Sequence, residues 1–105
     1  AVMELHTFSS LNKNFINQYE NTMDKADHAI VYFSPEVIKH KRLPELTKED
    51  VEEAFKGNNL QVYTNSEDVI SILKNLAPIN QTNVLIMTSG NLNGQNLNEL
   101  GKGLI

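Results

Sequence analysis

The chain has 105 residues, of which 40% are hydrophobic and 21% are charged, as expected for one soluble globular domain. Its net charge is −4 and its densest basic run, 39–42, is short, so binding to the phosphate backbone of nucleic acids is not expected. The absence of cysteine excludes disulfides, thiolate metal sites and a thiol nucleophile. The longest apolar runs are too short to span a bilayer and no signal peptide is visible, so no membrane partner is expected, and the lack of cysteine fits a reducing cytoplasm.

The first third of the chain predicts two strands separated by a helix. Residues 1–5 are strand-like, and Ser9 or Ser10 is placed to cap a helix from about 11 to 25, where apolar residues recur at three-to-four spacing. The run 29–33 is continuously apolar, which is typical of a strand in a parallel sheet covered on both faces.

Helices and strands continue to alternate through the rest of the chain. The expected elements are a helical turn near 37–38, a helix from the Thr47–Asp50 capping box to a stop at Gly57, a strand at 60–63, a helix after 65, a strand at 83–87 and a short helix at about 96–100. This order predicts an α/β fold: a Rossmann-like, three-layer open parallel sheet of about four strands flanked by helices. The strands at 29–33 and 83–87 are expected to lie adjacent to or near each other.

Two polar turns follow apolar strands, and they carry the candidate site. The carboxyl ends of parallel strands meet at one edge of a sheet, so both turns are expected to open there onto a single ligand. An imidazole can donate to a carboxylate or phosphate, and glycine lets backbone amides approach an anion. The candidate substrate-binding residues are His6, Thr7, Ser9, Ser10, Ser89, Gly90, Asn91 and Asn93. The alternative is that these residues only form turns and caps, and that His6 is structural.

Motifs for catalysis or metal binding are not found in the sequence. There is no GxxxxGK[ST] loop, no GxGxxG and no nucleophile elbow, and the three histidines lack metal-ligand spacing. We therefore expect no catalytic residue and no bound cofactor or metal within this chain, and no turnover of a nucleotide by the chain alone.

Three short motifs, in this order and spacing, resemble the C-terminal domain of Mur ligases. They are Glu4-Leu5-His6-Thr7-Phe8-Ser9-Ser10, Ala26-Asp27 before the second strand, and Met87-Thr88-Ser89-Gly90-Asn91. The similarity covers nearly the whole chain. It is greatest to the family members that join UDP-N-acetylmuramate to L-alanyl-γ-D-glutamyl-meso-diaminopimelate in muropeptide recycling, and next to those that add L-alanine.

The resemblance implies a cytoplasmic, ATP-dependent ligase of peptidoglycan metabolism and cell wall biogenesis. In that family ATP converts the muramate carboxylate to an acyl phosphate, which the amine of the peptide attacks to form an amide. ATP and Mg²⁺ are held mainly by a central domain, over which the C-terminal domain closes while it binds the incoming peptide. By this resemblance, residues 1–105 are that substrate-binding lid, inactive alone, with the central domain, UDP-N-acetylmuramate and the peptide as partners.

The chain departs from the family pattern at three places. Relatives that add L-alanine have His-Arg-Tyr where this chain has His6-Thr7-Phe8, and Asp-Val-Tyr where it has Phe33-Ser34-Pro35, so those contacts are not carried over. The family domain begins with a further strand and helix before the position of Ala1. We therefore expect an N-terminally truncated domain whose exposed sheet edge can pair with another chain. The alternative is a stand-alone flavodoxin-like or Rossmann-like module that binds a ligand or a protein without catalysis.

Overall fold

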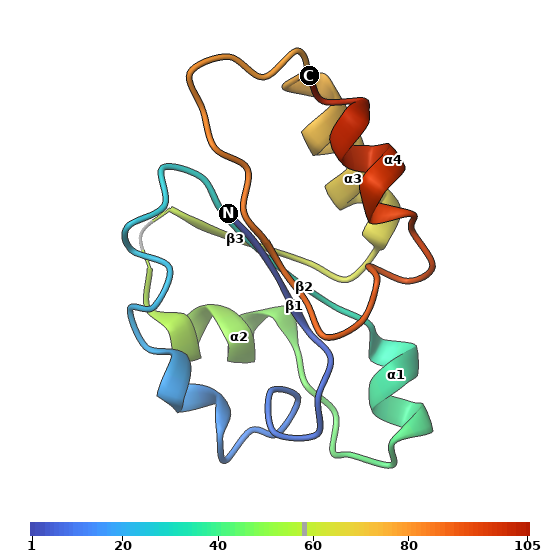
Figure 1. Ribbon diagram of the computed structural model, residues 1–105. Helices are drawn as coiled ribbons and strands as arrows, with labels where there is room; N and C mark the ends of the chain where they lie inside the picture. Colours follow the sequence, from blue (N-terminus) through green and yellow to red (C-terminus); the bar gives the residue numbers. More distant parts are fainter. Residues whose placement is uncertain (58) are drawn as a thin grey trace.

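Four parallel strands form the centre of the protein. The computed structural model describes residues 1–57 and 59–105, and Figure 1 shows its sheet with helices on both sides. The strands are β1 (Val2–Leu5), β2 (Ala29–Phe33), β3 (Leu60–Tyr63) and β4 (Ile86–Met87), paired in parallel in the order β3-β2-β1-β4. The predicted α/β fold, a three-layer Rossmann-like arrangement around a parallel sheet, is confirmed.

The two faces of the sheet are covered by different elements. Helix α2 (Lys48–Phe55) and the 3-10 helix η1 (Ile16–Tyr19) lie below the sheet in Figure 1, and helices α3 (Ser66–Asn75) and α4 (Leu97–Lys102) lie above it. Helix α1 (Pro35–His40) follows the carboxyl end of β2. Since side chains alternate along a strand, each face has its own apolar core. The lower core includes Leu5, Val31, Phe33, Val51 and Phe55, and the upper core includes Val2, Ile30, Tyr32, Val69 and Leu100.

Helices α2 and α3 both begin where the sequence predicted, at residues whose side chains accept hydrogen bonds from the first helical turn. At α2 the Thr47 hydroxyl accepts from the Asp50 amide (3.1 Å), and the Asp50 carboxylate accepts from the Thr47 amide (2.9 Å), which is a complete capping box. Helix α2 ends at Phe55, and its C-cap Lys56 has a left-handed backbone (φ 57°), directly before the predicted stop at Gly57. None of the helices in residues 1–57 and 59–105 has the length and apolar character needed to cross a membrane.

The predicted helix at 11–25 is wrong, because this segment forms successive turns around the short η1. Asparagine side chains compete with helical hydrogen bonding, and four of them lie here. The Asn12 side chain accepts from the amide of Asn14 (2.8 Å), and Asn21 has a left-handed backbone (φ 60°). The expected helix cap is also absent, since the Ser10 amide donates back to the Thr7 hydroxyl (3.1 Å) in a turn.

The fourth strand is shorter than the predicted range 83–87. Only Ile86 and Met87 form β4, while Val84 and Leu85 remain 37% and 56% exposed. The carbonyl of Leu85 still accepts from the Val2 amide (2.8 Å), so the contact with β1 begins one residue before the strand. Among residues 1–57 and 59–105, strand β4 pairs only with β1, which limits its ladder. Strands β2 and β4 are close, as expected, but β1 lies between them.

Candidate functional site

The turns after β1 and β4 meet at the carboxyl edge of the sheet. The two strands are neighbours, with Met3 opposite Met87, so the residues that follow them come together. The approach is close, because a Cβ placed on Gly90 would lie 3.3 Å from Cγ of His6 and 3.1 Å from Oε1 of Glu4. The convergence expected from the sequence is therefore present, and a side chain at position 90 would crowd it.

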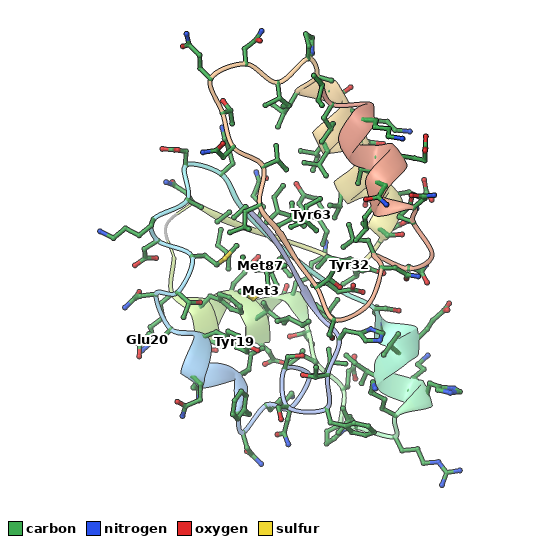
Figure 2. All side chains as sticks on the ribbon, in the orientation of Figure 1. Met3, Tyr19, Glu20, Tyr32, Tyr63 and Met87 are labelled. Atoms are coloured by element: carbon green, nitrogen blue, oxygen red, sulfur yellow. The ribbon has the colours of Figure 1, made fainter. Side chains whose placement is uncertain are left out.

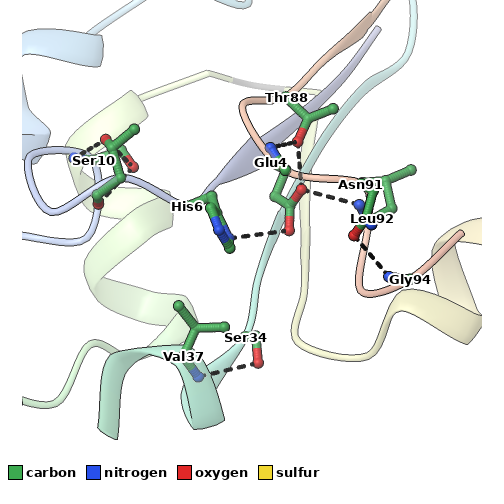
Figure 3. A network of polar contacts seen from close by, with 11 residues as sticks. Glu4, His6, Ser10, Ser34, Val37, Thr88, Asn91, Leu92 and Gly94 are labelled. Atoms are coloured by element: carbon green, nitrogen blue, oxygen red, sulfur yellow. Dashed lines mark hydrogen bonds and ion pairs between the residues drawn. The ribbon is translucent and has the colours of Figure 1, made fainter. Parts of the chain in front are cut away.

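Glu4 is a buried acid that ties the two turns together. Its side chain is only 4% exposed, and Oε1 accepts hydrogen bonds from the Thr88 hydroxyl and from the Leu92 amide (3.1 Å) (Figure 3). The Thr88 hydroxyl in turn accepts from the Gly90 amide (2.8 Å). A buried carboxylate is stable only when such donors replace water. The turn after β4 is thus held by an acid 84 to 88 residues earlier in the chain.

His6 lies beside the other oxygen of Glu4. Its Nδ1 is 3.8 Å from Oε2, and the side chain is 37% exposed, so one part of the ring meets the acid and another part reaches solvent (Figure 3). A separation of 3.8 Å is too long for a hydrogen bond, but the negative charge orients the ring electrostatically. With Nδ1 turned towards Glu4, Nε2 is the nitrogen left for a ligand.

Tyr32 brings a third polar group to the same edge. It pairs in register with Glu4 and is 1% exposed. Burial raises the pKa of Tyr32 above its usual value of 10.0, and the charge of Glu4 acts in the same direction, against hydrogen bonds with Ser66 and Ser34. The phenol therefore stays protonated at neutral pH.

Sequence reasoning did not select Glu4, Tyr32 or Thr88 as site residues. The sequence carries a signal for two of the three: Glu4 is the one acid inside an apolar strand, and Tyr32 carries the only polar side-chain atom in the run 29–33. An acid and a phenol in buried strands require partners, and adjacent positions on neighbouring strands supply them.

The turn after β1 is held by its own hydroxyl groups. The Thr7 hydroxyl donates to Oγ of Ser10 (3.0 Å), and the Ser10 hydroxyl donates to the Thr7 carbonyl (3.1 Å). Ser10 is buried, whereas Thr7 and Ser9 are exposed. The buried Ser10 hydroxyl thus stabilises the turn, whereas Thr7 contributes to the turn and is also exposed to solvent.

Two hollows open at this edge and divide the predicted site residues between them. A hollow of about 230 Å³ is lined by residues of β1, β4, η1 and the turns that follow β1 and β4, namely Met3, Glu4, Thr7, Ser10, Tyr19, Met87, Thr88 and Ser89. Figure 2 labels Met3, Tyr19 and Met87, which lie on the side of the sheet covered by η1. A second hollow of about 350 Å³ is lined by His6, Ser34, Glu36, Val37, His40, Lys41 and Asn93. Three of the eight predicted residues line neither hollow: the exposed Ser9 and Asn91, and the partly buried Gly90.

The turn after β4 has an unusual backbone. Leu92, Asn93 and Gly94 have successive positive φ angles of 54°, 61° and 89°, in the left-handed region that disfavours residues such as leucine. Three contacts compensate: the Leu92 side chain is completely buried, its amide donates to Glu4, and the Gly94 amide donates to the Asn91 side chain (2.8 Å). This geometry presents Ser89, Asn91 and Asn93 to solvent.

Within residues 1–57 and 59–105, no group of three or more His, Asp and Glu side chains is placed to bind a metal ion. A larger hollow, about 530 Å³, lies at the opposite, amino edge of the sheet, where its lining includes Ala1, His28 and Leu85. It shares only Met87 with the carboxyl-edge hollows.

Comparison with protein-family models, with curated proteins and with solved structures finds no match for this chain. Its function is therefore inferred from the geometry of the carboxyl edge together with the sequence motifs that form it.

Proposed function

We propose that this chain is the substrate-binding C-terminal domain of a Mur-type, ATP-dependent ligase that joins a peptide amine to the carboxylate of UDP-N-acetylmuramate. One observation carries the proposal. Two of the motifs that resemble the family, 4–10 and 87–91, are far apart in the sequence and form one polar edge, joined by the hydrogen bond from Thr88 to Glu4. A ligand at the carboxyl edge of a parallel sheet contacts both motifs at once.

The proposed reaction needs a domain of this kind to hold the nucleophile. The muramate carboxylate takes the γ-phosphoryl group of ATP, which releases ADP and leaves an acyl phosphate. The peptide amine then attacks the acyl carbon, phosphate leaves, and the amine loses a proton as the amide forms. ATP and Mg²⁺ belong to the central domain of such enzymes. This chain contributes polar groups that bind and orient the peptide, which lowers the entropic barrier to attack.

His6 is the residue best placed for that role. Its ring is partly exposed, Glu4 orients it from one side, and it lines the larger hollow of the carboxyl edge. A peptide that ends in γ-D-glutamyl-meso-diaminopimelate carries several carboxylates, for which an imidazole N–H is a suitable donor. The hydroxyls of Thr7 and Ser89 line the neighbouring hollow and offer further donors.

The direct experiment is a ligation assay with the complete polypeptide that carries this domain. UDP-N-acetylmuramate and ATP are mixed with L-alanyl-γ-D-glutamyl-meso-diaminopimelate, with the corresponding tetrapeptide or with free L-alanine, and the product is identified by mass spectrometry. We expect ATP-dependent product with the tripeptide in preference to L-alanine. If none of the three amines yields an ATP-dependent product, the ligase proposal is wrong, and a non-catalytic binding module becomes the better reading of the same edge.

Replacing His6 with alanine tests the site within that assay. Loss of one hydrogen bond to a charged group costs about 1.5–3 kcal/mol, so kcat/KM for the peptide should fall roughly ten- to a hundredfold. His28→Ala is the matched control, because His28 is exposed and lies at the amino edge. Unchanged ligation with a large fall in melting temperature would show instead that His6 is structural.

A further inference from the structure

Asn93 and Gly94 form an asparagine–glycine pair in the turn after β4. It is the one such pair in the sequence, since none of the other glycines follows an asparagine. Both residues are exposed, and within residues 1–57 and 59–105 the Asn93 side chain makes no hydrogen bond. Among the described residues, no atom other than those of its chain neighbours would lie within 4 Å of a Cβ on Gly94. The space around the pair is therefore open.

An asparagine–glycine pair places a nucleophile next to an electrophile of the same chain. When the Gly94 amide loses its proton, its nitrogen attacks Cγ of the Asn93 side chain and a five-membered succinimide forms. The side-chain nitrogen takes up a proton and leaves as ammonia. Water then opens the ring at one of its two carbonyls, which gives aspartate or isoaspartate. Glycine favours the ring closure, because it has no Cβ to obstruct the approach of the two groups.

In the folded protein the nucleophile of this reaction is held by Asn91. The Gly94 amide donates to the Asn91 side chain (2.8 Å), as Figure 3 shows. The next amide along the chain, that of Gln95, donates to the Asn91 carbonyl (2.9 Å). The Gly94 nitrogen keeps its proton while that hydrogen bond exists, so the bond must break before the nitrogen can attack. The reaction therefore requires a local opening of the turn.

We propose that Asn93 is a site of spontaneous deamidation, and that the Asn91 side chain sets the rate of this reaction in the folded protein. Asn93 lines the hollow of about 350 Å³ at the carboxyl edge, together with His6 and Lys41. The carboxylate of the product is ionised at neutral pH, so the reaction adds a negative charge to that hollow and disfavours an anionic group there. The inference needs only the turn itself and does not depend on the proposed function.

Tandem mass spectrometry of the complete polypeptide that carries this chain tests the proposal. Deamidation is located by fragmentation after incubation at neutral pH, both in native buffer and in guanidinium chloride, which removes the turn. In the denaturant we expect Asn93 to react before the other asparagines of the chain, and in native buffer we expect it to react more slowly. Asn91→Ala should raise the native rate about two- to tenfold, because opening of the turn no longer breaks that hydrogen bond. It should leave the rate in denaturant unchanged.

Two further variants separate the role of Asn91 from a general loosening of the turn. Asn91→Asp keeps an oxygen that accepts from the Gly94 amide, so it should retain the slow native rate. Ser89→Ala is the matched control, because Ser89 is exposed in the same turn, whereas the Gly94 amide donates to Asn91. Circular dichroism establishes that each variant is folded.

Two kinds of result would overturn the proposal. If Asn93 does not react first in denaturant, it is not the deamidation site. If the native rate equals the rate in denaturant, or if Asn91→Ala and the original chain react equally fast in native buffer, Asn91 does not set the rate.

Discussion

Strands β2 and β4 come from apolar runs of similar length, yet they form very different strands. All five residues of β2 are buried, whereas β4 has two residues and both are only partly buried. Strand β2 lies between β1 and β3 with helices on both faces, whereas in the part of the chain that the structure describes β4 pairs with β1 alone. The apolar character of a run therefore predicts that a strand exists. Its length and burial depend on neighbours that are distant in sequence.

The largest expected effect comes from two isoleucines that flank the same residue. Ile30 of β2 and Ile86 of β4 lie on either side of Val2 and pack into the upper core. Ile30 is 4% exposed, so Ile30→Ala should cost about 2–5 kcal/mol. Ile86 is half-buried, so Ile86→Ala should cost less, about 1–2 kcal/mol. Urea denaturation with a common m-value measures both losses.

The difference between the losses for Ile30→Ala and Ile86→Ala measures how much more tightly β2 is packed than β4. Val84→Ala is the control, because this exposed residue precedes β4 and its truncation should change stability by no more than about 0.5 kcal/mol. Equal losses for Ile30→Ala and Ile86→Ala would mean that β4 is packed as tightly as β2.

A smaller effect is expected from the acid that supports the turn after β4. Glu4→Gln removes the charge that strengthens two hydrogen bonds in a buried place, so it should lower the free energy of unfolding by about 1–3 kcal/mol. Thr88→Val removes one of the two donors and should cost about 1 kcal/mol. Ser89→Ala, in the same turn but exposed, is the control. If both replacements of Glu4 and Thr88 are neutral in urea melts, other contacts hold the turn.

The smallest effect concerns the local cap of α2. The Thr47 amide, followed by the Thr47 hydroxyl and Lys13, holds the pKa of Asp50 below its usual 3.8. Because the folded pKa is the lower one, the stabilisation is present above about pH 4 and is lost as pH falls through the lowered pKa. Asp50→Asn should remove this acid dependence, with a loss at pH 7 below about 1 kcal/mol since Asp50 is partly exposed. The stability of both proteins is measured by thermal or urea denaturation at pH 7 and at acid pH. If Asp50→Asn loses stability in acid as much as the original chain does, the prediction is wrong.

The contrast between Asp50 and Glu4 explains what the sequence could predict. Thr47 and Asp50 are three residues apart, and their pattern alone identified the start of α2. The apolar run of β2 likewise predicted a buried strand, and two polar turns after strands predicted a shared edge. By contrast, the spacing of apolar residues at 11–25 suggested a helix, but the asparagines there form local hydrogen bonds that favour turns.

The interior of the site was beyond sequence reasoning for a related reason. Thr88 and Leu92 find their partner in Glu4, 84 and 88 residues earlier. The sequence of the turn itself does not indicate these hydrogen bonds, because they form only when β1 and β4 lie side by side. The exposed residues of the turns could be named from composition, but which buried groups pair with one another beneath them could not.

The anchoring of the turn after β4 has a consequence for how such an edge can diversify. Its fixed points are a backbone amide, a threonine hydroxyl and a buried leucine, while Ser89 and Asn93 point to solvent and make no side-chain hydrogen bond within the described part of the chain. The groups that maintain the shape are thus separate from the exposed groups at which the proposed ligand would bind. A substitution at Ser89 would change the chemistry of the exposed surface without touching the contacts that hold the turn, whereas one at Asn93 would also have to fit a left-handed backbone (φ 61°).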